Sequence, residues 1–268
     1  MRIRLARFED YDAIVRLEAT LNPATLSRDD WGLLWLGNPV WPHVSAHWPI
    51  GWVLETLAGE LVGCMGNIPL RYHFEGEELL AGSGRGWIVL PDFRAYGSAR
   101  RLLEAHMQQP SVDFVMDTSV SKEAAERFGF LAKRAPAGDW GTVAYFVTGY
   151  GAFAARALRK LKVPLAGMLA PAAGMGLHLK DAVFGKRFPE HSAFEIEETD
   201  RFDSRFDAFW DELLRQKSET LLAARDSATL SWHFAVPMRK RRVWIFTASR
   251  SRQLRAYAIF ERRDDGQE

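Results

Sequence analysis

The segment from residue 87 to residue 107 constrains the fold of this 268-residue chain more than any other part. A short apolar run at residues 87–90 is closed by Pro91, and an amphipathic pattern at residues 98–107 predicts a helix. Gly97 separates the two, where the missing side chain permits unusual backbone angles and close approach of a ligand. Unpaired amides at a helix N-terminus bind phosphate oxygens, and the helix dipole helps them. The segment therefore predicts a strand, a phosphate-binding turn and a helix in immediate succession.

Basic side chains gather around this turn. Arg94 precedes Gly97, and Arg100 and Arg101 follow it in the first turn of the predicted helix. Guanidinium groups bind phosphate oxygens through charge-assisted hydrogen bonds. We therefore expect these three arginines to add positive charge where a pyrophosphate is held.

The residues around the turn resemble the acetyl-CoA-binding motif of the GNAT superfamily of N-acyltransferases. That motif reads Arg or Gln, two residues, Gly, one residue, then Gly or Ala, and Arg94, Gly97 and Ala99 satisfy it. The resemblance also includes an N-terminal strand and helix, an antiparallel meander before the motif, and a Phe-Gly-Phe at residues 128–130. It covers residues 1–147.

This resemblance implies both a fold and a cofactor. The fold would be α/β, with a GNAT-like mixed, mainly antiparallel sheet flanked by helices. The cofactor would be acetyl-CoA or another acyl-CoA, lying between Leu90 and the end of a strand expected at residues 112–116. The strand before the turn would pair with the pantetheine amides, and a bulge often splays this strand from its neighbour. The implied cofactor-binding residues are Ile88, Val89, Leu90, Arg94, Ala95, Tyr96, Gly97, Ser98 and Ala99.

The catalytic positions depart from the family's pattern. Many members carry a tyrosine that protonates the leaving thiolate, four residues before the glycine of the late motif, and that position here is Ala125. The asparagine seven residues earlier corresponds to Thr118. Asp117, at the end of the expected strand, is the candidate general base by position, and capping of the following turn is the competing role.

Composition divides the chain into three segments. Residues 1–148 are expected to form a GNAT-like acyl-CoA-binding domain, residues 149–190 a basic connecting segment rich in Ala, Leu and Gly, and residues 191–268 a second, incomplete GNAT-like unit. An internal echo suggests the second unit: the Arg-Asp pairs that begin at positions 28 and 225 are each followed by a tryptophan, a proline and a strand hairpin.

Hydrophobic periodicity predicts the remaining elements. The connecting segment is expected to be partly helical. The expected strands are at residues 2–7, 143–147 and 194–196, hairpins at 52–65, 70–81 and 243–260, and helices at 13–17, 122–127 and 206–214.

The charge balance limits the partners. There are 35 basic and 34 acidic residues, so the chain has no overall field to attract nucleic acid, and none is expected as a partner. Cys64, the one cysteine, lies in an apolar stretch and is expected to be buried. The N-terminus has no apolar signal run, so a cytoplasmic location is expected. The basic connecting segment is compatible with contact with an anionic membrane, but covering a neighbouring apolar flank is the commoner role for such helices.

Three further groups of residues have simpler explanations than a site. No metal is predicted: His43 and His47 lack a third ligand, and nearby prolines disfavour a long helix. The basic run at residues 239–242 is interpreted as a solvated hairpin edge. Core packing is favoured over an acceptor pocket for five closely spaced tryptophans, at positions 31, 35, 41, 48 and 52.

The predicted function is transfer of an acetyl or other acyl group from coenzyme A to an amine. The acceptor would be a small molecule or a cell-envelope precursor. The second of these is suggested because the tandem arrangement resembles double-GNAT proteins associated with bacterial cell-envelope synthesis. Two alternatives stay open. The chain could be a non-catalytic acyl-CoA-binding or assembly module with a degenerate GNAT fold, or a transferase of the peptidoglycan-bridge type that uses aminoacyl-tRNA, against which the near-neutral charge argues.

Overall fold

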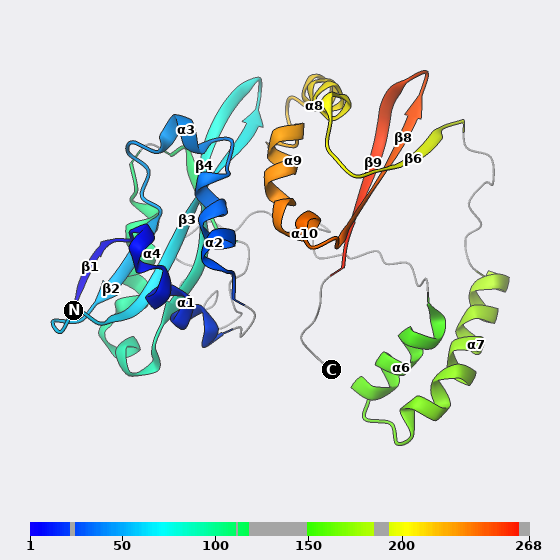
Figure 1. Cartoon of the computed structure of the whole chain (residues 1–268), viewed down its shortest axis with the longest axis horizontal. Helices are drawn as coiled ribbons and strands as arrows, with labels where there is room; N and C mark the ends of the chain where they lie inside the picture. The colour runs from blue at the N-terminus through cyan, green and yellow to red at the C-terminus, as the bar shows by residue number, and fades with distance from the viewer. Residues whose placement is uncertain (22–24, 111, 118–148, 185–192, 263–268) are drawn as a thin grey trace. The chain divides into compact units, whose positions relative to one another are not determined.

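The computed structural model describes residues 1–21, 25–110, 112–117, 149–184 and 193–262 (Figure 1). The described chain forms two compact units, one from residues 1–128 with 193–268 and the other from residues 129–192. The predicted three-segment division stays a prediction, although the last segment packs with the first. The helix expected at 122–127, the strand at 143–147, and Thr118, Ala125 and the Phe-Gly-Phe lie outside the described residues.

The main sheet of the first unit is mixed and mainly antiparallel, as predicted. All neighbouring strands run antiparallel except the last pair, which is parallel. The strands lie in chain order across the sheet: β1 (Arg2–Leu5), β2 (Gly51–Glu55), β3 (Leu61–Phe74), β4 (Glu77–Val89) and β5 (Phe114–Met116).

Strands β3 and β4 correct the prediction of two separate hairpins followed by an isolated strand. Each is one long strand, of 14 and 13 residues, and residues 87–89 are the end of β4. The Gly-Asn-Ile-Pro sequence at residues 66–69 looks like a turn but lies within β3. The strand continues because Asn67 is fully buried and its side chain hydrogen-bonds to Pro49 O and to Gln109 Oε1, at 2.9 and 2.7 Å.

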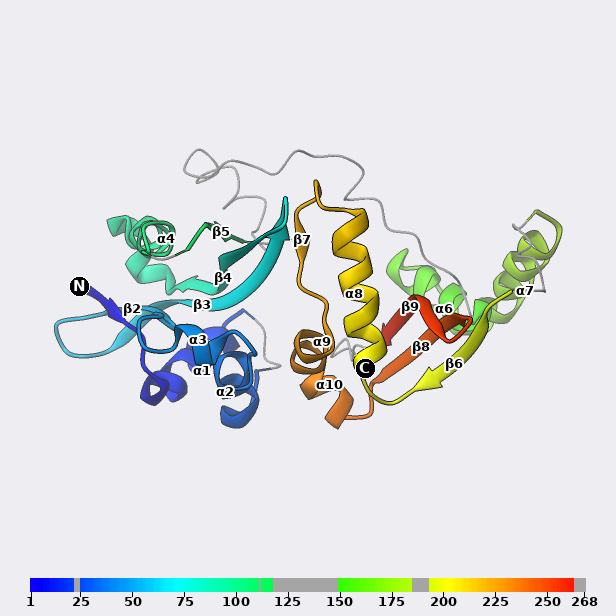
Figure 2. The ribbon, with the colours of Figure 1, turned by 90° about the horizontal axis from the view of Figure 1, so that it is seen from above.

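Helices cover both faces of this sheet, with α4 on one face and α1 and α2 on the other (Figure 2). Helix α1 spans Tyr11–Ala19, α2 spans Arg28–Leu36 and α4 spans Ser98–Met107, and a short helix α3 (Trp41–Val44) follows α2. Ser27 starts α2 by accepting a hydrogen bond from the amide of Asp30, at 3.2 Å. The helix predicted at 98–107 is confirmed.

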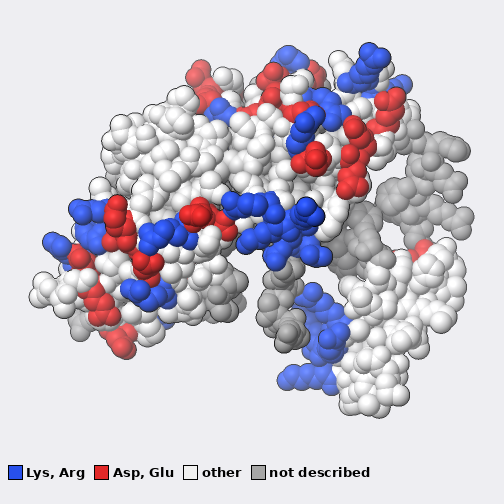
Figure 3. Space-filling model, viewed as in Figure 1, with Lys and Arg blue, Asp and Glu red and all other residues white. Residues whose placement is uncertain are grey.

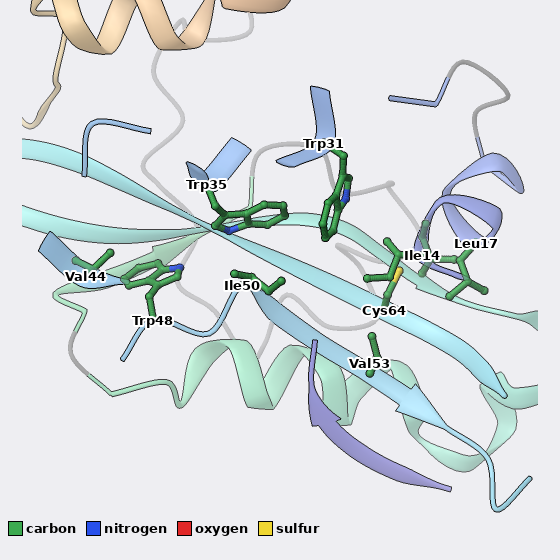
Figure 4. Packing of buried hydrophobic residues seen from close by; sticks show 10 residues of the cluster. Ile14, Leu17, Trp31, Trp35, Val44, Trp48, Ile50, Val53 and Cys64 are labelled. Carbon is green, nitrogen blue, oxygen red and sulfur yellow. The ribbon is translucent and has the colours of Figure 1, made fainter. Parts of the chain in front are cut away.

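The tryptophans form the core rather than a pocket lining, as favoured from the sequence. Trp31, Trp35, Trp48 and Trp52 are each at most 7% exposed, and three of them appear in Figure 4. The indoles of Trp35 and Trp48 both donate to the backbone carbonyl of Asn67, at 2.7 and 3.0 Å. Two polar ring edges are thus satisfied inside the core by one carbonyl of β3.

A second, smaller sheet is formed by the last segment of the chain, with order β6 (Glu195–Thr199), β8 (Val243–Arg250) and β9 (Gln253–Glu261). Helix α8 (Ser204–Gln216) packs on β9, and Phe206 lies fully buried in the core between them. Strand β7 (Leu222–Ala223) instead pairs with β3 of the main sheet.

The internal echo corresponds to two capped helices that contact each other. Asp226 caps α9 (Ser227–His233) through the amide of Thr229, as Ser27 caps α2. Trp232 of α9 donates its indole N–H to Leu33 O of α2, at 2.8 Å. The two tryptophans of the echo therefore differ in role. Trp35 packs in the core beside the main sheet, and Trp232 links α9 to α2.

The basic run at residues 239–242 is not simply a solvated edge. Arg239, at the end of α10 (Ala235–Arg239), forms an ion pair with Asp30, and Lys240 lies 3.7 Å from the same carboxylate. Asp30 is buried, so these cations compensate the charge of a carboxylate that would otherwise be costly to bury.

Cys64 is buried, as expected, and burial raises the pKa of its thiol to about 12. The thiol therefore stays protonated and unreactive at neutral pH.

The second unit contains a helical hairpin, as predicted for a partly helical segment. It consists of α6 (Tyr150–Lys160) and α7 (Ala166–Phe184), which pack against each other. Among the described residues, no helix combines the length and the apolar character that crossing a bilayer requires.

His106 of α4 provides a test of the core. It is fully buried, and burial lowers its pKa to about 4 from 6.5, so the folded state holds it neutral. Below pH 6.5 the unfolded state binds this proton first, and stability is therefore lost as the pH falls toward 4. Between pH 7 and 5, the wild-type protein should lose about 2 kcal/mol more unfolding free energy than a His106→Gln variant. Urea denaturation followed by tryptophan fluorescence measures this, and parallel pH profiles would contradict it.

Candidate functional site

Strand β4 extends well beyond its parallel neighbour. The two strands pair only from Ala81 with Phe114 to Ser83 with Met116. Beyond that point β5 ends and β4 continues to Val89. Within the described residues, positions 84–89 therefore have no strand partner on the side where β5 would continue.

A bulge lies within this extended part of β4. Gly66 pairs with Arg85 and Cys64 with Ile88, so the single residue Met65 stands opposite two residues of β4, Gly86 and Trp87. Gly86 has φ +60°, a left-handed conformation that favours glycine. The bulge that the resemblance implied is thus present in the predicted strand, and it changes the direction of the strand just before the turn.

The turn ends at Gly97, which has φ +67° and forms the N-cap of α4. The chain reaches it through a 3-10 helix, Pro91–Tyr96. Among the described residues, no side chain caps α4, and none places a heavy atom within 4 Å of a Cβ added to Gly97. The first amides of α4 thus begin beside open space, and they have no partner within the helix.

The three arginines differ in the contacts that they make, and the expectation that all three add charge for an anion stays a prediction. Arg94 donates from Nε to the carbonyl of Val89, at 2.8 Å, and so holds the turn against the end of β4. Arg100 pairs with Glu104 across one helical turn, at 2.7 Å. Arg101 is exposed and forms no ion pair with a residue that the structure describes, so it is the cation best placed for a phosphate.

The predicted cofactor residues offer backbone rather than side chains. Ile88 and Val89 are buried, and Ser98 is fully buried with no hydrogen-bond partner for its hydroxyl. Trp87 donates its indole N–H to the carbonyl of Ala99, at 3.0 Å, and ties α4 to the bulge. Leu90 lies at the end of this edge, and Ala95 and Tyr96 are the last residues of the 3-10 helix. The nine predicted residues therefore lie on one continuous path, although their binding role stays a prediction.

Asp117 follows β5 at the point where β5 leaves β4. The residue as a whole is exposed, but its carboxyl group lies so close to Gly84 that a Cβ there would overlap its Oδ1. This partial desolvation raises the pKa of Asp117. Among the described residues its carboxylate accepts no hydrogen bond, and the turn that it was alternatively expected to cap lies outside them.

A cavity of about 420 Å³ lies within the first unit, on the side of the sheet where β7 and α9 approach β3. Its wall is mostly apolar and includes Leu70, Leu230 and Phe234. Tyr72 lines the same cavity, packs edge-on against Phe114, and donates its hydroxyl to Met116 Sδ at 2.9 Å. One side chain of β3 therefore contacts both the cavity and the strand that leads to Asp117.

A few polar groups break the apolar wall of the cavity. Arg225 is exposed and forms no ion pair with a described residue. Burial lowers the pKa of His233 and raises that of Tyr257, so both are neutral at pH 7. The cavity thus combines mostly apolar walls with two cations, Arg225 and the ion-paired Arg71, and with several neutral polar side chains. Such a composition is common in small-molecule sites.

The sequence analysis did not find this cavity or the ion pair beside the bulge. Glu18 Oε1 lies 3.4 Å from Arg85 Nε and close to Gly86. These two residues are 67 positions apart in the sequence, and no local pattern links them. The Arg-Asp of the internal echo was the one signal that pointed to Arg225.

Two solved structures share this fold over 98% of the chain. One, from Enterococcus faecalis V583, is described as a conserved protein of unknown function and probable N-acyltransferase, and it is 12% identical with a TM-score of 0.54. The other, a GCN5-related N-acetyltransferase from Kribbella flavida, is 10% identical with a TM-score of 0.52. The chain has the GNAT fold. It spans 55% and 54% of the lengths of these two proteins.

Sequence comparison gives no closer relative. No protein-family profile matches the chain, and no curated protein sequence matches it. The GNAT fold is therefore recognised here from its backbone, and at such low identity the likeness concerns the fold alone.

Gly97 provides a test of the turn. Valine at this position would place a branched side chain in the open space beside the first amides of α4, so we expect CoA affinity to fall by about tenfold or more. Isothermal titration with CoA measures the change. Gly59→Val is the matched control, because Gly59 also has positive φ and open surroundings but lies in the β2–β3 turn. Equal CoA affinity in the two variants would contradict a phosphate site at Gly97.

Proposed function

We propose that this chain transfers an acyl group from an acyl-CoA to an amine. One observation carries the proposal: the bulged end of β4, which has no parallel strand partner among the described residues, is joined by the 3-10 helix 91–96 to a helix N-terminus that opens beside Gly97. Bound acyl-CoA would supply an activated acyl group as a thioester. The two proteins of similar structure, an N-acetyltransferase and a probable N-acyltransferase, support the same class of reaction.

The residues present fit an acyl-CoA. The backbone at Ile88, Val89 and Leu90 can pair with amide groups of an extended ligand in the manner of an added strand. The first amides of α4 and the guanidinium of Arg101 can hold a diphosphate. Because both contacts use backbone for the most part, they need few particular side chains.

Asp117 is the proposed general base. The amine nitrogen forms a bond to the acyl carbon as the carbon–sulfur bond breaks, and CoA leaves as a thiolate that takes a proton from solvent. The proton lost by nitrogen passes to the Asp117 carboxylate and then to solvent. Because desolvation raises its pKa, the Asp117 carboxylate is a stronger base than a carboxylate with the ordinary pKa. Its position next to Gly84 is where the two strands separate.

The cavity beside Tyr72 is the proposed acceptor pocket. Its walls suit an apolar or aromatic body, and Arg225 suits a carboxylate or phosphate on the same molecule. The acceptor class is thus an amphipathic amine that carries an acidic group.

Two measurements test the function. Thermal denaturation with and without acetyl-CoA, longer acyl-CoAs and free CoA measures binding. Release of free thiol with a panel of amines, half of them bearing an acidic group, measures turnover. Stabilisation by CoA with no thiol release for any amine would favour a binding module. Insensitivity to every CoA species would exclude both of these functions and favour aminoacyl-tRNA as the donor.

Asp117→Asn tests the base. We expect kcat to fall by about a hundredfold or more while the KM for acyl-CoA is unchanged, since an amide cannot take the proton. The rise of kcat/KM with pH through the ionisation of this carboxyl should also disappear. Asp113→Asn is the matched control: Asp113 accepts a hydrogen bond from the amide of Leu80 at 2.7 Å, and asparagine can still accept it. Equal activity of the two variants would exclude Asp117 as the base.

Arg225→Ala tests the acceptor pocket. Loss of a charge-assisted hydrogen bond should raise the KM of acceptors with an acidic group by about tenfold, and leave the KM of acyl-CoA unchanged. Acceptors without an acidic group should be unaffected. Arg250→Ala, at an exposed position of β8 outside the cavity, is the control. If Arg225→Ala changes no acceptor KM, the cavity is not the acceptor pocket.

A further inference from the structure

The helical hairpin of the second unit packs through small residues. The buried positions of α6 and α7 are Ala154, Ala166 and Ala170, together with Gly174. A Cβ added to Gly174 would come within 2.8 Å of the Cα of Gly151. The two backbones therefore approach closely, as they do where residues of the small-x-x-x-small type face another helix.

Because small residues fill this interface, the large apolar side chains point away from it. In a helix of an ordinary globular protein such side chains face the core, and polar ones face solvent. Here the arrangement is reversed, and six large apolar residues are 63–76% exposed: Leu161, Leu165, Met168, Met175, Leu179 and Val183.

The charge of the hairpin is strongly basic. Residues 150–184 contain five basic side chains and one acidic side chain. The acidic one, Asp181, accepts a hydrogen bond from the Tyr150 hydroxyl at 2.8 Å. Figure 3 shows Lys and Arg gathered along α6, whereas the surface of α7 is almost free of charge. Lys160 and Lys162 flank the exposed Leu161 in the turn between the helices.

That turn has a defined and unfavourable backbone conformation. Lys162 and Leu165 have φ +55° and +59°, which is uncommon for residues with a side chain. This turn places the exposed Leu161, Leu165 and Met168 at the same end of the hairpin as Lys160 and Lys162. Apolar side chains and cations are thus combined in one small surface, which we call the hairpin tip (residues 160–168).

We propose that the hairpin binds the surface of an anionic lipid bilayer. Its apolar side chains enter the boundary between headgroups and acyl chains, and the lysines of the tip contact acidic headgroups. An apolar helix with an uncharged surface needs a nonpolar environment, and the adjacent cations select one that carries negative charge. An anionic bilayer supplies both the nonpolar environment and the negative charge. The lysines of the hairpin tip therefore favour a bilayer over a purely apolar protein surface.

Co-sedimentation of the full chain with vesicles tests this inference. We expect binding to phosphatidylcholine vesicles that contain roughly 30% phosphatidylglycerol, and binding at least tenfold weaker to phosphatidylcholine alone. Binding to the anionic vesicles should fall as salt is raised from about 0.1 to 0.5 M. Replacing both Lys160 and Lys162 by alanine should weaken it by about fivefold for each charge.

A double variant, Leu165→Asp with Met168→Asp, tests the apolar contribution. Aspartate tolerates the positive φ at position 165, so the turn is retained while vesicle binding falls by about tenfold or more. Leu57→Asp is the matched control, since Leu57 is 98% exposed in the β2–β3 turn, and this variant should bind vesicles like the wild type. Circular dichroism confirms that the helices of each variant are intact.

Three results would overturn the inference. The first is no binding to anionic vesicles, and the second is equal binding to neutral and anionic vesicles. The third is a wild-type chain that is dimeric by analytical ultracentrifugation, does not bind vesicles, and becomes monomeric in the aspartate variant, which would identify a second copy of the chain as the occupant.

Discussion

The hydrogen bonds of Asn67 are the constraint on which the main sheet and its helices depend. This residue is fully buried in β3, where its carbonyl accepts two tryptophan indoles and its side chain bonds Pro49 O and Gln109. Gln109 in turn contacts His106 in α4. Buried polar groups are expensive to leave unpaired, so each partner can occupy only one position. The network thereby fixes α2 and α4 to opposite faces of the same strand.

The candidate cofactor site depends on the point at which β4 and β5 stop pairing. Strand β5 pairs with β4 for three residues and then ends, and the bulge at Gly86 changes the direction of what remains of β4. The proposed ligand contacts here come mainly from backbone amides, which almost any sequence can supply. This explains why the fold is evident from the backbone although no family profile matches the sequence. Gly97 is the exception, because its left-handed conformation favours glycine.

The apolar surface of the proposed acceptor pocket is enclosed, whereas that of the hairpin is exposed. In the cavity, apolar walls are enclosed between β3 and the helix α9, and a single exposed cation, Arg225, stands among them. In the hairpin, the apolar surface is open, because alanine and glycine occupy the helix–helix interface. The two proposals together describe an acyltransferase for amphipathic amines that works at a lipid surface.

The sequence by itself determined the elements that carry strong local signals: the helix after Gly97, the strand before it, the buried cysteine and the partly helical basic segment. Periodicity and glycine chemistry act within a few residues, so they can be read from the chain. It misplaced the ends of β3 and β4, since the Gly-Asn-Ile-Pro segment is held extended by contacts with residues far away, such as Gln109. Only the tertiary structure decided that Asp117 lies against Gly84 and that Tyr72 contacts both a cavity and β5. It also decided that Arg94 hydrogen-bonds to the end of β4, whereas Arg101 forms no ion pair with a described residue. Those facts depend on which strands pair and where they part, a property of long-range packing that local sequence does not encode.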